Sequence, residues 1–266
     1  MDPAGAPCVA DAPLPPPPAH PRRLVYLGSP EMAVPPLRAL HEAGFEIALV
    51  VTGADKRRGR GGATSPTPVG LEAMALGLPV SHDAREAADV GADLGVVVAF
   101  GELLRRPLLQ ALPMVNLHFS LLPRWRGAAP VERAILAGDE RTGVCVMAVE
   151  VGLDTGGVYA RSELAIRRTS TATELGAQLT EVGSRLLVDV LRGGLADPPE
   201  PQVGEATYAH KLTNEDRHLD WGRPALELHR VVRIGGAWTT FRGRRLKVLE
   251  AVVDPGEGPP EPSADA

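Results

Sequence analysis

Three polar side chains at alternate positions close an apolar stretch of the sequence: Asn116, His118 and Ser120. In an extended strand, residues i and i+2 project from the same face, so these side chains are expected to lie together. Asn offers an N–H donor to a developing oxyanion, and His can donate to the same oxygen or transfer a proton. The cluster favours acyl-group chemistry, although a strand-end cap and a satisfied core histidine would also explain it.

A second polar cluster supplies a carboxylate. Asp154 lies in the segment Gly152–Gly157, after an apolar strand-like run that ends at Val149. An aspartate there can orient a histidine or accept a proton from an amine, and an Asx turn is the alternative interpretation. Combined with Asn and His, this carboxylate suits transfer of an acyl group to an amine through a tetrahedral intermediate.

Other kinds of chemistry have little support in the sequence. No His-x-x-x-His is present, and no carboxylate lies within a few residues of His118, so no metal is expected. A Gly-x-Ser-x-Gly elbow is absent, and Gly28 is followed by Ser-Pro rather than by a dinucleotide-binding fingerprint. These patterns disfavour a metalloenzyme, a serine hydrolase and a nicotinamide-dependent enzyme.

The composition fits one α/β domain with a small appendage. The 266 residues are 44% hydrophobic but only 4% aromatic, so Val, Leu, Ala and Ile must form the core. The net charge of −5 excludes a protein that is basic throughout, but it allows local basic patches. The sequence has no charged start followed by an apolar run and no long apolar segment. We therefore expect a cytoplasmic monomer with no membrane partner.

Apolar runs alternate with segments of helical spacing, which predicts an α/β fold with a doubly wound, mostly parallel sheet. The expected strands are 24–28, 47–51, 94–100, 114–118, 144–149 and 158–166. The expected helices are 31–43, 69–76, 103–112, 130–137 and 171–191.

Proline-rich and acidic stretches suggest the domain boundaries. We expect a disordered Pro/Ala-rich tail over 1–22, an α/β domain over 23–194, a linker over 195–206, a small β-rich module over 207–253 and a second tail over 254–266. In the small module, 225–232 reads as a helix and 238–241 and 246–253 as strands, with Arg242-Gly243-Arg244 as a hairpin turn.

Two groups of cations suit contact with phosphates, although a solvated surface would also explain the first. The first group is Lys56, Arg57, Arg58 and Arg60, which lie close to glycines. The second group is Arg242, Arg244, Arg245 and Lys247 in the small module, where positions 245 and 247 would share a strand face.

The stretch from Asn116 to Pro130, with its Ser-Leu-Leu-Pro-Arg-Trp-Arg-Gly core, resembles the methionyl-tRNA formyltransferase family. The resemblance extends over nearly the whole chain between the tails. Its other elements are Tyr26–Pro30, Gly59–Gly61, Pro66–Val69, Val97–Gly101, Ala137–Asp139, Thr142–Val144, Met147, Gly152–Gly156, Ala209–Leu212, Asp220-Trp221 and Gly236–Thr239.

This resemblance implies a Rossmann-like formyltransferase fold and the transfer of formyl from 10-formyltetrahydrofolate to the α-amine of initiator methionyl-tRNA, a step in translation initiation. It implies that Asn116 and His118 stabilise the oxyanion, and that Asp154 positions His118 and assists proton removal from the amine. It also implies contact of the first cation group with the acceptor end of the tRNA, and the second cation group is a further candidate for tRNA contact. The implied folate pocket comprises Phe100, Gly101, Ser120, Leu121, Leu122 and Pro123.

The sequence departs from this family in its small module. The family has an OB-like barrel after the linker, and 207–253 is too short for a closed five-stranded barrel. Either the truncated module packs its open edge on the catalytic domain, or tRNA binding depends more on the loop at 56–62.

Three other functions remain open at this stage. One is a formyltransferase for a small amine, such as an amino-sugar nucleotide or glycinamide ribonucleotide. The second is a folate-binding module without activity, which the presence of Asn116, His118 and Asp154 disfavours. The third is an enzyme that hydrolyses the formyl folate.

Overall fold

The computed structural model describes residues 13–57 and 64–254. The helices are α1 (Val34–Glu42), α2 (Pro68–Ala75), α3 (Arg106–Ala111), α4 (Pro130–Ala137), α5 (Ala172–Gly193) and α6 (Ala225–Arg233), with 3-10 turns η2 (Glu31–Ala33), η3 (Ala84–Ala88) and η4 (Glu215–Arg217). The longer strands are β1 (Arg23–Gly28), β2 (Glu46–Val51), β6 (Leu94–Val98), β7 (Met114–His118), β9 (Arg141–Ala148), β10 (Val158–Ala165), β12 (Trp238–Phe241) and β13 (Arg244–Lys247). The short strands are β3 (Lys56–Arg57), β4 (Thr64–Ser65), β5 (Val80–Ser81), β8 (Arg126–Gly127) and β11 (Tyr208–Ala209).

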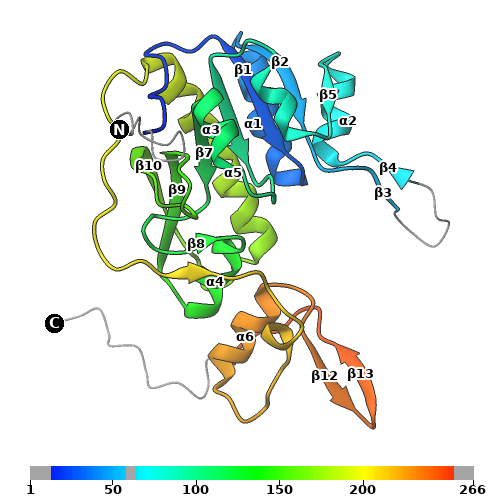
Figure 1. The fold of residues 1–266 in the computed structure, drawn as a ribbon. Coiled ribbons are helices and arrows are strands. Elements are labelled where there is room, and N and C mark those ends of the chain that lie inside the picture. Colours follow the sequence, from blue (N-terminus) through cyan, green and yellow to red (C-terminus); the bar gives the residue numbers. More distant parts are fainter. Residues whose placement is uncertain (1–12, 58–63, 255–266) are drawn as a thin grey trace, which may run out of the picture.

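A seven-stranded sheet of order β10-β9-β7-β6-β1-β2-β5 forms the centre of the α/β domain (Figure 1). The strands β5, β2, β1, β6 and β7 run parallel, and β9 and β10 extend this sheet as antiparallel strands. The predicted mostly parallel sheet is therefore confirmed. Strands β1, from Leu24 onward, and β6 are continuously apolar because both of their faces are buried.

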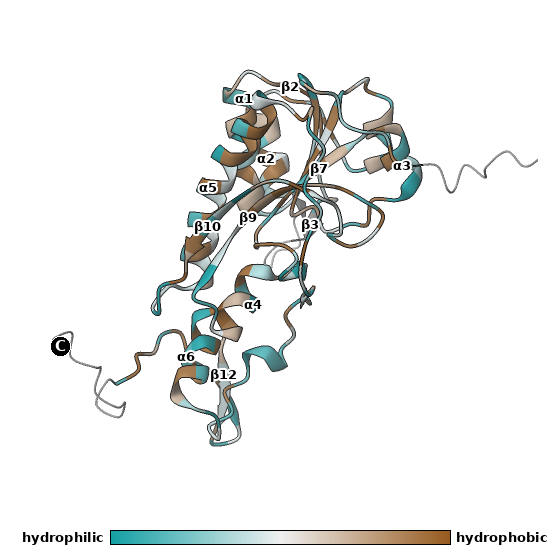
Figure 2. Ribbon diagram, turned by 90° about the vertical axis from the view of Figure 1, so that its left-hand side faces the viewer, coloured by the Kyte–Doolittle hydropathy of each residue, from teal (hydrophilic) through white to brown (hydrophobic). Residues whose placement is uncertain are grey.

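Each face of the sheet packs against its own layer. Leu24 and Tyr26 of β1 belong to a core cluster that also contains residues of α1, α2 and α5, while Val25 and Leu27 face a cluster with Leu109 of α3. This alternation is the pleat of the strand, and it makes the sheet doubly wound. In Figure 2 the hydrophobic residues gather on this sheet and its helices.

The sheet face that packs against α3 has a different cover at β9 and β10, beyond β7. Leu122, Cys145, Met147 and Val158 form a small separate cluster there, and none of these residues comes from a helix. Loops and the segment that leads to the C-terminal module lie over this part of the sheet. A sheet face covered by loops leaves room for side chains that act on a ligand.

Residues 13–22, which we expected in a disordered tail, contact the α/β domain. Leu14 packs in the α3 layer, and the amide of Leu195 donates to the carbonyl of Ala19. The carbonyl of Arg22 accepts from the amide of Glu46, next to β1. Apolar contact and backbone pairing thus order a proline-rich segment whose composition indicates disorder. Residues 1–12 and 255–266, the remainder of the two expected tails, lie outside the described residues.

The C-terminal module consists of α6 and the β12–β13 hairpin, with a small core of Leu219, Val231, Val232 and Ala237. The second strand is Arg244–Lys247, so the expected strand over 246–253 was placed too late. Arg242 and Gly243 alone form the turn, with φ of 48° and 72°, while Arg244 already pairs with Phe241. Two successive left-handed residues are typical of a type I′ hairpin, which matches the twist of its strands.

Ion pairs and strand pairing join the two parts of the chain. Arg133 of α4 binds Asp216 at 2.6 Å, and the buried Arg233 donates from its guanidinium to the carbonyls of Ser170 and Arg167. Strand β11 pairs with β8, so the C-terminal segment adds to the loop that follows β7. Among the helices of the described residues, none is long and apolar enough to cross a membrane.

Candidate active site

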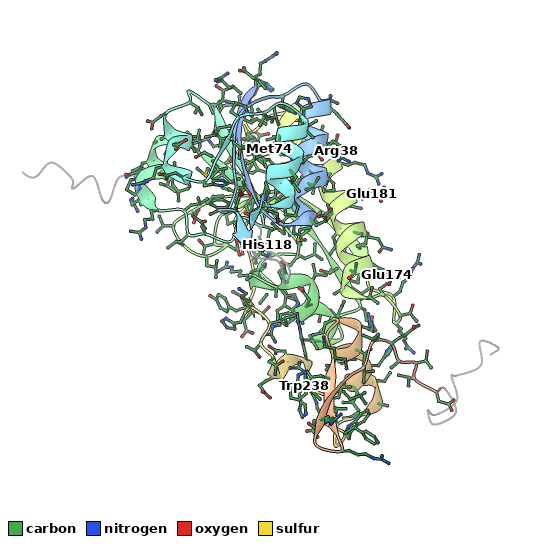
Figure 3. All side chains as sticks on the ribbon, turned by 90° about the vertical axis from the view of Figure 1, so that its right-hand side faces the viewer. Arg38, Met74, His118, Glu174, Glu181 and Trp238 are labelled. Carbon is green, nitrogen blue, oxygen red and sulfur yellow. The ribbon has the colours of Figure 1, made fainter. Side chains whose placement is uncertain are left out.

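Asn116 and His118 project from the loop-covered face of the sheet. Their neighbours Val115 and Leu117 belong to the core cluster on the opposite face, which contains α5. The alternation predicted for this strand is therefore present. Figure 3 shows His118 in the middle of the molecule, between the sheet and the C-terminal module that carries Trp238.

The imidazole of His118 is buried and has a fixed orientation. Its Nε2 lies 2.9 Å from the carbonyl oxygen of Trp125. A carbonyl can only accept, so Nε2 carries a proton in this arrangement. The other nitrogen, Nδ1, faces Asp154, with 3.7 Å between Nδ1 and Oδ2. Any second hydrogen bond that the His118 ring donates must therefore come from Nδ1.

The carboxylate of Asp154 lies between the other two members of the cluster. Its Oδ2 accepts from the backbone amide of Gly127 at 2.8 Å, and its Oδ1 accepts weakly from Asn116 Nδ2 at 3.4 Å. The residue has a φ of 50°, a left-handed conformation that Asp tolerates better than most side chains. The structure thus unites the three residues that the sequence singled out.

Asp154 reaches this position from the far end of β7. Strand β9 is antiparallel to β7, with Ala148 opposite Val115, so the loop after β9 begins where β7 begins. The loop then folds back over the sheet face. A Cβ atom at Gly156 would lie 2.0 Å from the carbonyl oxygen of Ala148, so this close approach requires glycine.

A carboxylate that sequence reasoning did not assign holds the loop after β7. Asp139 accepts from Arg124 Nε at 2.9 Å, from Arg124 Nη2 at 2.6 Å and from Trp125 Nε1 at 2.7 Å. The hydrogen bond with Asp139 raises the pKa of Arg124. Trp125 has a φ of 64°, and its carbonyl is the one that binds His118. Asp139 thereby supports Trp125, whose carbonyl binds the candidate catalytic residue His118. The only signal for Asp139 in the sequence was its place in the Ala137–Asp139 element of the family resemblance.

The expected linker supplies a second unforeseen residue. Gln202 Nε2 donates to the carbonyls of Asp154 at 2.9 Å and of Gly156 at 2.8 Å. Its Oε1 accepts from Arg126 Nε at 3.0 Å and from Nη2 at 2.7 Å. The surrounding prolines indicated a linker, and nothing in the local pattern pointed to the site.

The arrangement suits direct transfer of an acyl group. Asn116 has a second amide hydrogen for an oxyanion, and Asp154 can accept a proton close to it. Cys145, opposite His118 on β9, is fully buried, and this burial raises the pKa of its thiol, which disfavours a covalent thioester. Within 13–57 and 64–254, no group of three or more His, Cys, Asp or Glu side chains could hold a metal ion.

Comparison with known proteins shows the family of the chain. Residues 22–191 match the formyl transferase family and residues 211–264 match the formyl transferase C-terminal domain. The methionyl-tRNA formyltransferase of Ruegeria pomeroyi is 44% identical over 90% of this chain and 84% of its own length. The chain belongs to the methionyl-tRNA formyltransferase family. The Symbiobacterium thermophilum methionyl-tRNA formyltransferase is 43% identical over 91% of this chain and 79% of its own.

A solved structure extends the comparison of the fold. The N-formyltransferase of Helicobacter canadensis, in a complex with folinic acid and dTDP-3-aminofucose, has a TM-score of 0.65 and 16% identity. The match covers 86% of each chain. At this identity the likeness concerns the fold alone, and it agrees with the mostly parallel sheet expected of the family.

The candidate folate residues of this family member lie on two neighbouring strand ends. Phe100 and Gly101 follow β6, whose Val97 pairs with Asn116 of β7, and Gly101 has a φ of 81°. In the stretch after β7, Ser120 is fully buried and donates to the carbonyl of Arg124 at 2.6 Å. Phe100 and Leu122 are also buried in apolar clusters, while Leu121 and Pro123 are half-buried. Contacts with a folate would therefore come mainly from backbone groups.

The candidate tRNA residues lie on two projections. Lys56 and Arg57 form β3, which pairs with β4, and Arg58 and Arg60 lie outside the described residues. The β12–β13 hairpin carries the second cation group, whose members Arg242, Arg244, Arg245 and Lys247 are all exposed. Both the β3–β4 arm and this hairpin project from the body in Figure 1. Among the described residues, no hydrogen bond or ion pair links this hairpin with Asn116, His118 or Asp154.

Proposed function

We propose that this protein transfers the formyl group of 10-formyltetrahydrofolate to the α-amino group of initiator methionyl-tRNA. The observation that carries the proposal is the convergence of Asn116, His118 and Asp154 on one loop-covered sheet face. It occurs in a chain that aligns over 90% of its length with relatives named methionyl-tRNA formyltransferase. Amide, imidazole and carboxylate together supply the donors and the proton acceptor that such a transfer needs.

In the proposed reaction, the amine attacks the formyl carbon, and a C–N bond forms as the carbonyl oxygen becomes an oxyanion. Asn116 donates its second N–H to this oxygen. His118 donates from Nδ1, because Nε2 is bonded to Trp125, and the ring must carry both protons for this role. Asp154 accepts the proton that the attacking amine loses. The oxyanion then re-forms the carbonyl as the bond between the formyl carbon and N10 breaks, and N10 takes up the proton that Asp154 accepted, which restores the carboxylate.

The acceptor and donor assignments have separate support. The exposed cations of the hairpin and the cations of the β3–β4 arm suit the phosphates of an RNA backbone. Stretches after β6 and β7 whose side chains are largely buried suit a pteridine, which can bond to main-chain donors and acceptors. On this proposal, Phe100, Gly101 and Ser120–Pro123 line the folate site.

The test is a formyl-transfer assay with the purified full chain and 10-formyltetrahydrofolate. Charged initiator tRNA is the acceptor, elongator methionyl-tRNA is the control, and an amino-sugar nucleotide and glycinamide ribonucleotide are the small-amine arms. We expect formylation of the initiator tRNA far above all other acceptors. Preferred transfer to a small amine would overturn the acceptor assignment, and formate release without any acceptor would indicate a hydrolase.

A further inference from the structure

Gln202 lies on the segment that connects the α/β domain with the C-terminal module, yet its side chain is bonded to the loop of Asp154. We propose that Gln202 is a positioning residue that holds Asp154 in reach of Asn116 and His118. The inference rests on the proposed function, because it concerns the reaction in which Asp154 takes part.

The amide of Gln202 has both of its ends occupied by groups of opposite character. The amide nitrogen faces two carbonyl oxygens, those of Asp154 and Gly156, and the amide oxygen faces the Arg126 guanidinium. A flipped amide would place an oxygen against two carbonyls and an NH₂ group against a cation. The orientation is therefore determined by its partners, and a side chain with only acceptors cannot replace it.

The bonds of Gln202 complete a closed arrangement around the carboxylate. The side chain of Arg126 binds Gln202, and the next residue, Gly127, donates its backbone amide to Asp154 Oδ2. Gln202 in turn binds the carbonyl of Asp154 itself. Asp154 is thus held at two points. Gly127 binds its carboxylate, and Gln202, which is itself bound by Arg126, binds its main-chain carbonyl.

The loop of Asp154 needs these hydrogen bonds because its apolar side chains are largely exposed. Val151 and Leu153 are 50% and 58% exposed, so core burial does not hold this loop. The left-handed conformation of Asp154, with a φ of 50°, is also unfavourable for a residue other than glycine. Without the two donations from Gln202, the loop can relax to other conformations and move the carboxylate. A misplacement of about 1 Å in a catalytic group can lower the rate by about 100-fold.

The experiment compares three variants of the full chain in steady-state assays that give kcat and the KM for both substrates. Gln202→Glu keeps an acceptor for Arg126 but loses both N–H donations, and Gln202→Met loses both functions. Glu200→Gln is the control, since Glu200 lies two residues away on the same segment and its exposed side chain binds Arg161 rather than the loop of Asp154. Melting curves check that each variant is folded.

We expect Gln202→Glu and Gln202→Met to lower kcat by about 10- to 100-fold, with KM for both substrates within about threefold of the unchanged protein. Glu200→Gln keeps full activity. If Gln202 only anchors the connecting segment, Gln202→Glu retains activity through its ion pair with Arg126, and this result would overturn the proposal. A rise in KM with unchanged kcat would overturn it as well.

A double-mutant cycle separates this inference from the proposed function. Because Gln202 acts through Asp154, adding Gln202→Glu to Asp154→Asn should lower the residual rate by less than about threefold. A fully additive loss would contradict the positioning role and leave the catalytic assignment intact. Full activity of Asp154→Asn alone would instead contradict the catalytic role proposed for Asp154, and the absence of formyl transfer to methionyl-tRNA by the unchanged protein would contradict the proposed function.

Discussion

In the α/β domain, Asn116, His118 and Asp154 are enclosed by loops and bonded to one another or to the main chain, whereas the cations of the β12–β13 hairpin are exposed. The first region depends on a few short distances with defined partners. The second region presents charge on a two-stranded support with a small core. Enclosed polar groups lose much when one partner is removed, while exposed charges act additively and are screened by salt.

The comparison therefore predicts two different responses to substitution. Single changes in the enclosed region should act on the chemical step and hardly depend on salt. Changes in the hairpin should act on tRNA affinity, in proportion to the charge removed, and should depend strongly on salt.

The largest effect is expected at the enclosed trio. Asp154→Asn and His118→Ala should each lower kcat by about 1000-fold or more, because each removes a group that acts on the transition state. Folate binding, measured by fluorescence quenching, and the melting temperature should change little. Glu181→Gln, an exposed change on α5 that is visible in Figure 3, is the control and should keep full activity. Turnover at the original rate in either site variant would remove that residue from the mechanism.

A smaller loss is expected at Asp139, which touches no reacting group in the proposed mechanism. Asp139→Asn weakens the bonds to Arg124 and Trp125, so the Trp125 carbonyl holds His118 less firmly. We expect kcat to fall about 10-fold and the melting temperature by a few degrees, since a hydrogen bond to a charged group contributes about 1.5–3 kcal/mol. The matched control is Asp83→Asn, which breaks the exposed local pair with Arg85. Equal activity of Asp139→Asn and Asp83→Asn would show that the loop after β7 keeps its conformation without Asp139.

These two sites also show how far the sequence leads. Asn116 and His118 could be predicted because a buried strand with a pleat of period two must place them on one face. Asp154 could not be placed by spacing, since it lies 36 residues after His118 on a loop that folds back from an antiparallel strand. The family resemblance was needed to join it to the other two.

The other residues that hold the candidate site in place could not be predicted from local sequence patterns. Gln202 lies among prolines that are typical of a connector, and its contacts cross 46 and 48 positions of the sequence. Strands β1 and β6 were predictable because both of their faces are buried, which makes residues 24–27 and 94–98 continuously apolar. The second strand of the hairpin was expected too late in the sequence because the apolar residues lie at positions 246, 248 and 249. The observed strand begins at Arg244, directly after the turn that the left-handed residues Arg242 and Gly243 form.

The hairpin should respond through binding. Arg245 and Lys247 pair with Thr240 and Trp238 and share one face, and Arg245 stacks on the Trp238 ring at 4.3 Å. A double Arg245→Ala/Lys247→Ala variant should weaken tRNA binding about 10-fold and leave kcat nearly unchanged. It should also lower the salt dependence, the slope of log K against log salt, by about 1–2, since each lost phosphate contact removes about 0.7–0.9.

Two charge-matched double variants sharpen this test. Arg242→Ala/Arg244→Ala removes the same charge from the turn and the other face of the hairpin, and its loss of affinity should be smaller. Arg85→Ala/Arg185→Ala removes two exposed cations of the α/β domain, and its affinity should not change. Unaltered affinity and salt slope after loss of Arg245 and Lys247 would show that tRNA does not use this face.

The smallest effect concerns the contact that joins the two regions. Arg133 and the hydrogen bonds of Thr213 lower the pKa of Asp216 to about 2. Since the pKa is about 3.9 in an unfolded chain, the pair stabilises the fold above about pH 4, and this contribution is lost as the pH falls through about 2. Asp216→Asn should therefore lower the melting temperature by about 2–4 °C near pH 7, the shift for about 1 kcal/mol in a chain of this size.

The pH dependence of this difference is the sharper measurement. The gap in melting temperature between the unchanged protein and Asp216→Asn should stay constant from about pH 7 to pH 5 and then close toward pH 2. Glu227→Gln, which breaks an exposed pair with Arg223 in the same module, should show no gap at any pH. A gap that persists at pH 2 would mean that Asp216 acts through packing rather than charge. The module would then be held by its strand pairing with β8 and by Arg233, which is bonded to carbonyls rather than to a carboxylate.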